Sequence, residues 1–169
     1  MKKAGDLLKD LRGGSTQQKL ANEMNVSREA ISRYENSKDK INVNVAQRIS
    51  KKYDDPRFAM TLQHEYTSTG PVWLDGPNID LHRSAVKEKT LEELEEAIHK
   101  LRSTSLVKPL NNLTAYELHD VREALNELVE AQTAISHLVA VVCMEANINY
   151  AGLWENHYRA LKSAGYVEV

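Results

Sequence analysis

Residues 1–66 carry apolar positions at helical spacing, in short runs separated by polar or glycine-containing turns. The first run is ended by Gly13 and Gly14, and Asp55 followed by Pro56 has the form of a helix N-cap and first helical position. The pattern predicts five short helices that close one core, with a polar loop at 36–40. The residues expected to face inward in the first, fourth and fifth helices are Leu7, Leu8, Leu11, Val45, Ile49, Tyr53, Phe58 and Leu62.

Residues 16–35 have the spacing of two short helices, at about 17–24 and 28–35, joined by a tight turn. Ala21 is small where two helix axes approach closely, and Asn25 tolerates the left-handed backbone that the turn needs. Val26 and Ile31 supply apolar contacts, and Ser27 is a favourable N-cap for the second helix. The outer side of that helix carries Arg28, Glu29, Ser32 and Arg33. This arrangement offers a helix to the major groove of DNA.

The segment resembles the helix-turn-helix of the phage repressor and Cro-like (Xre) family. The family pattern TQ…LA…V(S)…IS.YE is matched by Thr16, Gln17, Leu20, Ala21, Val26, Ser27, Ile31, Ser32, Tyr34 and Glu35. The resemblance covers about the first 60 residues and implies a five-helix, lambda-repressor-like DNA-binding domain. Two features depart from the family: Asn25 stands where it usually has Gly, and the connection at residues 12–15 is shorter than usual.

The candidate base-reading residues lie on the second helix of this motif. Arg28 and Arg33 can each form a bidentate contact with guanine, Glu29 can accept from cytosine N4, and Ser32 is a minor reader. The alternative for each arginine is a solvated surface charge. The resemblance implies that a second set contacts DNA phosphates: Gln17, Ser27, Asn36, Lys38 and Lys40.

The charge of the chain is divided unevenly along its length. The 169-residue chain has a net charge of −2, but residues 1–58 hold 13 Lys/Arg and 8 Asp/Glu, whereas residues 59–169 hold 9 and 16. The positive part is the part that carries the motif, as contact with phosphates requires. The asymmetry favours a DNA-reading head and a separate acidic body.

The remaining chain predicts a linker at 67–83 and a helical domain at 84–169. Gly70-Pro71 and Gly76-Pro77 are turn signals, although apolar residues around Trp73 favour a linker packed against a domain over a free tether. A small-molecule loop around Trp73 is the alternative.

Within 84–169, two pairs have the form of a capping box, Thr90 with Glu93 and Thr114 with Glu117. The second pair precedes a helix of about 30 residues, and a last helix at about 150–164 stops at Gly165. The long helix cannot bury its apolar stripe on its own chain, so a second subunit is the expected cover.

An enzyme is the rival interpretation of the C-terminal domain. Glu93-x-x-Glu96 and Glu117-x-x-Asp120 are similar to the motif of the all-α, MazG-like nucleotide pyrophosphatases, in which paired carboxylates hold magnesium. Acidic residues are also favoured in the first turn of any helix, which is the competing explanation. An inhibitor or adaptor with a protein-binding C-terminal domain is a third hypothesis.

Other chemistry is not indicated by the sequence. The six histidines form no i, i+4 pair, and the single cysteine, Cys143, is expected to be a small buried hydrophobe in a reducing cytoplasm. The apolar run from Leu138 to Met144 is short for a bilayer span.

We therefore expect an all-α, cytoplasmic transcriptional regulator without cofactor, metal or enzymatic activity. It would bind double-stranded operator DNA as a homodimer, act most simply as a repressor, and answer to a protein antagonist or ligand.

Overall fold

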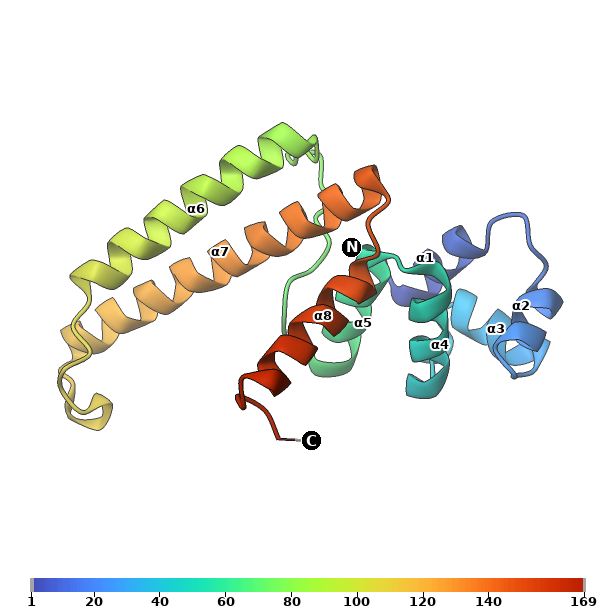
Figure 1. Ribbon diagram of the computed structural model, residues 1–169, viewed down its shortest axis with the longest axis horizontal. Coiled ribbons are helices and arrows are strands. Elements are labelled where there is room, and N and C mark those ends of the chain that lie inside the picture. The colour runs from blue at the N-terminus through green and yellow to red at the C-terminus, as the bar shows by residue number, and fades with distance from the viewer. Residues whose placement is uncertain (1, 169) are drawn as a thin grey trace. The chain divides into compact units, whose positions relative to one another are not determined.

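The computed structural model describes residues 2–168, and in that range the chain is all-helical, as predicted. It contains eight α-helices and one short 3-10 helix, with no strand among the described residues. The helices group into two compact units (Figure 1). One comprises the chain up to Gly76 together with the chain from Cys143 onward, and the other comprises Pro77–Val142.

The first unit begins with the five predicted helices. They are α1 (Ala4–Arg12), α2 (Gln17–Glu23), α3 (Arg28–Glu35), α4 (Val43–Tyr53) and α5 (Pro56–Thr67). The predicted local signals are confirmed: Gly13 ends α1 with a φ of 54°, and the Asp55 carboxylate accepts from the backbone N–H of Phe58 at the start of α5.

One apolar core holds these helices together. Its largest fully buried side chains include Phe58, Leu8, Leu20, Ile31 and Ile49. Every inward-facing residue expected from the sequence lies in this core or packs against it, with Leu11 and Tyr53 only partly buried. Burial of each such aliphatic or aromatic side chain contributes about 1.5–3 kcal/mol, so the core is the main source of stability of the domain.

α1 and α3 approach each other closely at Gly5. A Cβ atom added there would lie 2.0 Å from the backbone carbonyl oxygen of Tyr34. Glycine inside a helix costs about 1 kcal/mol relative to alanine, and here it allows the two helices to touch. The residue at this position therefore fixes the spacing between α1 and α3.

The C-terminal helix α8 (Tyr150–Ser163) packs with the N-terminal domain, so the division into compact units differs from the predicted domain at 84–169. The carboxylate of Asp54 accepts from the backbone N–H groups of Tyr150 (2.7 Å) and Ala151 (2.8 Å) and from the side chain of Asn149 (2.8 Å). An anionic side chain at a helix N-terminus satisfies free N–H groups and favours the helix dipole. Gly165 follows α8 with a φ of 72°, as predicted.

The segment between α5 and the next helix is irregular and partly buried. Pro71 is buried, and Val72, Trp73 and Leu74 are half-buried. Trp73 lines a small cavity with Leu7, Arg57 and Thr61 of the N-terminal domain. The part of the segment up to Gly76 is thus packed with that domain.

The second unit is a helical hairpin in which α6 (Arg83–Ser103) and α7 (Ala115–Ala146) run antiparallel, joined by a loop with the 3-10 turn η1 (Leu110–Asn112) (Figure 1). The last residues of α7, from Cys143, are grouped with the first unit. The capping box predicted at Thr114 and Glu117 is confirmed, with Thr114 N–H to Glu117 Oε2 at 2.9 Å and Glu117 N–H to Thr114 Oγ1 at 3.3 Å.

The capping box predicted at Thr90 and Glu93 is wrong. Both residues lie inside α6, which begins seven residues earlier with His82 as its N-cap. The Thr90 hydroxyl instead contacts two backbone carbonyls, those of Val86 (2.7 Å) and Ala134 of α7 (3.1 Å). A threonine three residues before a glutamate is a cap only where the backbone has not yet become helical.

The hairpin buries a narrow stripe and leaves much apolar surface exposed. Val86, Thr90, Glu93 and Ala97 of α6 are buried. The exposed apolar residues of the hairpin helices within this unit include Leu91, Ile98, Leu101, Leu118, Leu125, Leu128, Val129, Ile135 and Val142.

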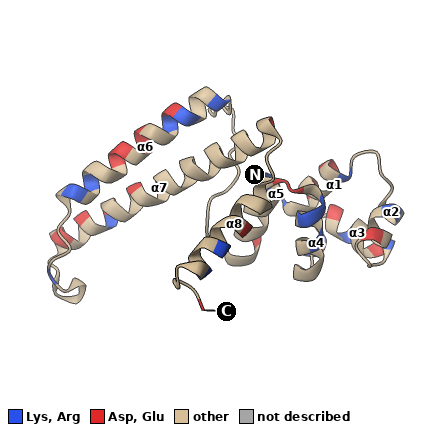
Figure 2. Ribbon diagram, viewed as in Figure 1, with Lys and Arg blue, Asp and Glu red and all other residues tan. Residues whose placement is uncertain are grey.

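The second half of α7 also carries few charges (Figure 2), and by length and composition alone the helix could cross a bilayer. The core helix of a soluble protein passes the same test, so this finding assigns no membrane role.

Candidate DNA-binding interface

The turn between α2 and α3 sets the position of α3. Asn25 adopts the predicted left-handed backbone, with a φ of 50°, and Val26 N–H donates to the Ala21 carbonyl at 3.0 Å. The Ser27 hydroxyl accepts from Ala30 N–H at 3.1 Å and caps α3. Because Ile31 is fully buried, the opposite side of α3 faces outward.

The predicted base-reading residues share that outward side. Arg28, Glu29 and Arg33 are exposed, and Ser32 is half-buried. Figure 2 shows the mixture of acidic and basic residues on α3. The arrangement fits a helix that presents its N-terminal turn to base edges.

Arg28 and Glu29 form an exposed ion pair, with Arg28 Nη2 3.1 Å from Glu29 Oε1. The side chains are 51% and 68% exposed. A hydrogen bond from the Glu29 backbone and the bond to Arg28 lower the pKa of the Glu29 carboxyl. Arg28 therefore offsets the negative charge that would otherwise face phosphates.

Arg33 is held by Asp39 of the following loop, which the sequence analysis did not anticipate. Arg33 Nε and Nη2 donate to the two carboxylate oxygens of Asp39 at 2.5 and 2.8 Å. This bidentate pair raises the pKa of Arg33 and lowers that of Asp39. Asp39 thus accepts from the same N–H groups of Arg33 that a bidentate contact with guanine would use.

The predicted phosphate-contacting residues fall into different settings. Lys38 is exposed, the Ser27 hydroxyl accepts the cap bond, and the Asn36 amide donates to the Ser32 carbonyl at 2.7 Å. Lys40 Nζ donates to the Glu65 carbonyl at 2.6 Å, and Gln17 Nε2 donates to Glu35 Oε2 at 2.7 Å. The structure therefore does not gather these side chains into one cluster.

Glu35 is the centre of a buried network that sequence reasoning missed. Its side chain is 2% exposed, and Arg12 Nε and Nη2 donate to its two carboxylate oxygens at 2.5 and 3.1 Å. Burial raises the pKa of Glu35, but the hydrogen bonds from Arg12 and Gln17 outweigh it and the pKa is lowered. The network ties α1 and α2 to the end of α3. The sequence signal was the place of Glu35 at the end of the family pattern, four residues after Ile31, and that pattern does not indicate its partners.

The acidic cluster of the enzyme hypothesis is not assembled as the sequence suggested. Glu117 accepts from Lys108 Nζ at 2.5 Å and from Thr114, whereas Asp120 lies 3.2 Å from Lys100 Nζ. The contact between Lys100 and Asp120 shows why: the antiparallel register sets Glu117 and Asp120 against the C-terminal end of α6, away from Glu93.

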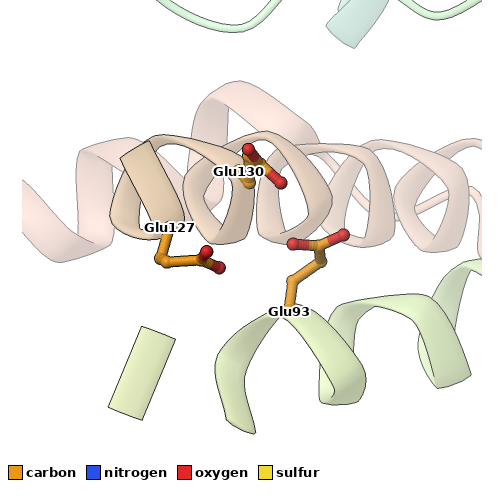
Figure 3. Close-up of side chains that lie close together, drawn as sticks. All are labelled: Glu93, Glu127 and Glu130. Atoms are coloured by element: carbon orange, nitrogen blue, oxygen red, sulfur yellow. The ribbon is translucent and has the colours of Figure 1, made fainter. Parts of the chain in front are cut away.

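Glu93 instead faces Glu127 and Glu130 of α7 (Figure 3). One carboxylate oxygen from each residue lies within 4.8 Å of the other two. Burial and the neighbouring carboxylates of Glu130, Glu96, Glu93 and Glu123 raise the pKa of Glu127. Such a raised pKa is typical of carboxylates placed close together.

Comparison with known proteins supports the N-terminal assignment. A family model described as helix-turn-helix matches residues 8–54. No curated protein and no solved structure gives a significant match to the chain.

The matched region and the geometry of α2 and α3 define a helix-turn-helix domain of the Cro/C1 type. The matched segment is confined to the N-terminal domain, and it supports a DNA-binding regulator.

Proposed function

We propose that the protein is a transcriptional repressor of phage or bacterial type that binds operator DNA as a homodimer through α3. The observation that carries the proposal is the exposed N-terminal turn of α3, with Arg28 at its first position and Ser27 as its cap. Residues at the start of a recognition helix are those that reach base edges in this class of domain.

Specificity comes from Arg28 and Arg33, assisted by Glu29 and Ser32. Arg28 makes only an exposed pair with Glu29, and such pairs contribute little to stability, so DNA can replace it at small cost. Arg33 must exchange Asp39 for a base or phosphate. Exposed Lys38 contributes to the phosphate contacts that fix register.

The hairpin of α6 and α7 is the dimerisation element in this proposal. Its exposed apolar residues, such as Leu125 (55%) and Val129 (60%), need a cover, and a second copy supplies one. Two-fold symmetric operators are read by dimers whose recognition helices are spaced about 34–36 Å apart, so a dimer also doubles the number of base contacts.

In this proposal the protein acts in the cytoplasm by occupying DNA, with no enzymatic step and no cofactor. A bound dimer hinders RNA polymerase, and a protein antagonist that competes for the hairpin releases it. A protein-binding adaptor is the alternative that the exposed hairpin favours.

The proposal is tested by binding to DNA that flanks the gene for this protein. Fluorescence anisotropy at several salt concentrations should show binding that weakens as salt rises, because phosphate contacts release counterions. Light scattering on the same sample should give the mass of two chains. Salt-independent or absent binding would refute the DNA-binding part, and a monomer mass would refute the dimer.

A further inference from the structure

We propose that Glu93, Glu127 and Glu130 form a binding site for one divalent, oxygen-seeking metal ion between α6 and α7. The three carboxylates come from both helices of the hairpin and point toward one another (Figure 3). Their nearest oxygens lie within 4.8 Å of one another, which is close enough for a single ion to contact all three after small side-chain movements.

The second observation is the state of Glu93. The residue is 7% exposed, and its Oε2 atom is buried without a hydrogen-bond partner. A buried carboxylate oxygen costs free energy unless it is hydrogen-bonded, paired with a cation or bound to a metal. The free oxygen belongs to the residue that faces Glu127 and Glu130, so a metal ion there would satisfy it.

Lys89 does not satisfy this oxygen. Its ammonium group lies 2.9 Å from Glu93 Oε1, the other carboxylate oxygen, and is shared with Glu92 at 2.8 Å. Lys89 is also 55% exposed and therefore approaches Glu93 from the solvent side. One shared lysine leaves three neighbouring carboxylates with excess negative charge.

The donor set selects the class of metal. Glu93, Glu127 and Glu130 offer only carboxylate oxygens, which suit Mg²⁺, Mn²⁺ and Ca²⁺ better than zinc or copper. Glu130 is exposed and Glu127 half-buried, so water can complete the coordination shell. The bound ion would bridge α6 to α7 and stabilise the hairpin.

Mn²⁺ binding to the full-length protein tests the site. Electron paramagnetic resonance measures free Mn²⁺ during a titration, and thermal unfolding with and without Ca²⁺ measures stabilisation. We expect one saturable site per chain, competition by Ca²⁺ and a higher melting temperature with metal. Absence of saturable binding up to about 5 mM Mn²⁺, near the weak end of protein calcium sites, would overturn the proposal.

Two charge-neutral variants locate the site. Glu130→Gln changes an exposed residue and should weaken Mn²⁺ binding about tenfold or more without unfolding the hairpin. Glu88→Gln is the matched control, because Glu88 is an exposed glutamate on α6, the helix that carries Glu93, and pairs only weakly with Lys87 at 3.4 Å. Equal affinities in the two variants would show that the ion is adventitious and overturn the proposal.

A third variant separates metal binding from general charge effects. Lys89→Met removes the cation that competes for Glu93 and should tighten Mn²⁺ binding several-fold. Unchanged or weaker binding in Lys89→Met would count against Glu93 as a ligand. The metal site is independent of the DNA-binding role, so failure of either leaves the other standing.

Discussion

The carboxylate of Asp54 accepts a hydrogen bond from the backbone N–H of Tyr150 at 2.7 Å, across 96 residues of chain. Asp54 itself ends α4 in a left-handed conformation, with a φ of 49°. One residue therefore closes a helix of the DNA-binding domain and opens the last helix of the chain. This contact explains why α8 belongs with the N-terminal unit.

Replacing Asp54 should loosen α8 without disturbing the end of α4. Asp54→Gly removes the side chain but tolerates the positive φ, so the loss is that of the cap, about 1–2 kcal/mol. Hydrogen exchange should then accelerate in Tyr150–Ser163. Glu155→Gln, an exposed change on the same helix, is the control. Unchanged protection in Asp54→Gly would show that the cap is dispensable.

Breaking the pair of Arg12 and Glu35 should destabilise the N-terminal domain. Glu35→Gln leaves Arg12 without its buried counter-charge, which costs about 3 kcal/mol for pairs of this kind. Urea unfolding measures the loss. The pKa of Glu35 is lower in the folded state than in the unfolded state. The pair therefore contributes fully to the free energy of unfolding above about pH 4.3, and this contribution is lost as the pH falls through the folded-state pKa.

Glu29→Gln is the matched control for Glu35→Gln, because Glu29 is an exposed acid on the same helix. It should leave the urea midpoint unchanged. A similar loss in both variants would mean that α3 itself, rather than the buried network, is sensitive to neutralisation.

Arg28→Ala should weaken binding to the specific operator by about 1–3 kcal/mol while weak non-specific binding persists. The reason is loss of a base contact at the first turn of α3. Anisotropy with operator and scrambled duplexes measures the difference. Arg102→Ala, an exposed change in the hairpin, should have no effect. An equal loss of binding free energy on the operator and the scrambled duplex would mean that Arg28 contacts a phosphate rather than a base.

Asp39→Asn should tighten DNA binding several-fold. The change removes a negative charge near the interface and weakens the bond that occupies Arg33. Association rates at low and high salt measure the effect, which should shrink as salt rises. Asp80→Asn, a change at an exposed residue of the linker, is the control. Weaker binding in Asp39→Asn would instead mean that Asp39 positions Arg33 for DNA.

The stability of the hairpin should fall as the solution becomes mildly acidic. His137 of α7 is 2% exposed, and burial lowers its pKa despite the bond between Nδ1 and the Thr133 carbonyl. The unfolded chain therefore takes up the proton first, and stability decreases as the pH falls below about 6.5. Melting temperatures between pH 7.5 and 5.5 should show a shallower slope in His137→Gln than in His99→Gln.

Local signals in the sequence predicted local structure well. Ser27, Asp55 and Thr114 cap the helices they were expected to cap, because each bond spans only a few residues. The same capping-box pattern gave a wrong prediction at Thr90. The residues before Thr90 are already helical, and its hydroxyl donates to the Val86 carbonyl instead.

The sequence pattern could not predict contacts between segments that are distant along the chain. The pairing of Arg12 with Glu35 depends on how α1 meets α3, and the grouping of Glu93 with Glu127 depends on the register of α6 against α7. Neither register is encoded by helical periodicity, which fixes only the face on which a residue lies. The outward residues of α3 were predictable because the motif itself defines that face.

The close packing around Gly5 suggests how to make a temperature-sensitive variant for genetic work. Since a methyl group there would collide with the Tyr34 carbonyl at 2.0 Å, Gly5→Ala would push α1 and α3 apart. The substitution changes none of the exposed side chains of α3 and strains the packing of α1 against the backbone of Tyr34. If the protein represses transcription as proposed, cells carrying Gly5→Ala should repress at low temperature and derepress on warming, which provides a conditional allele.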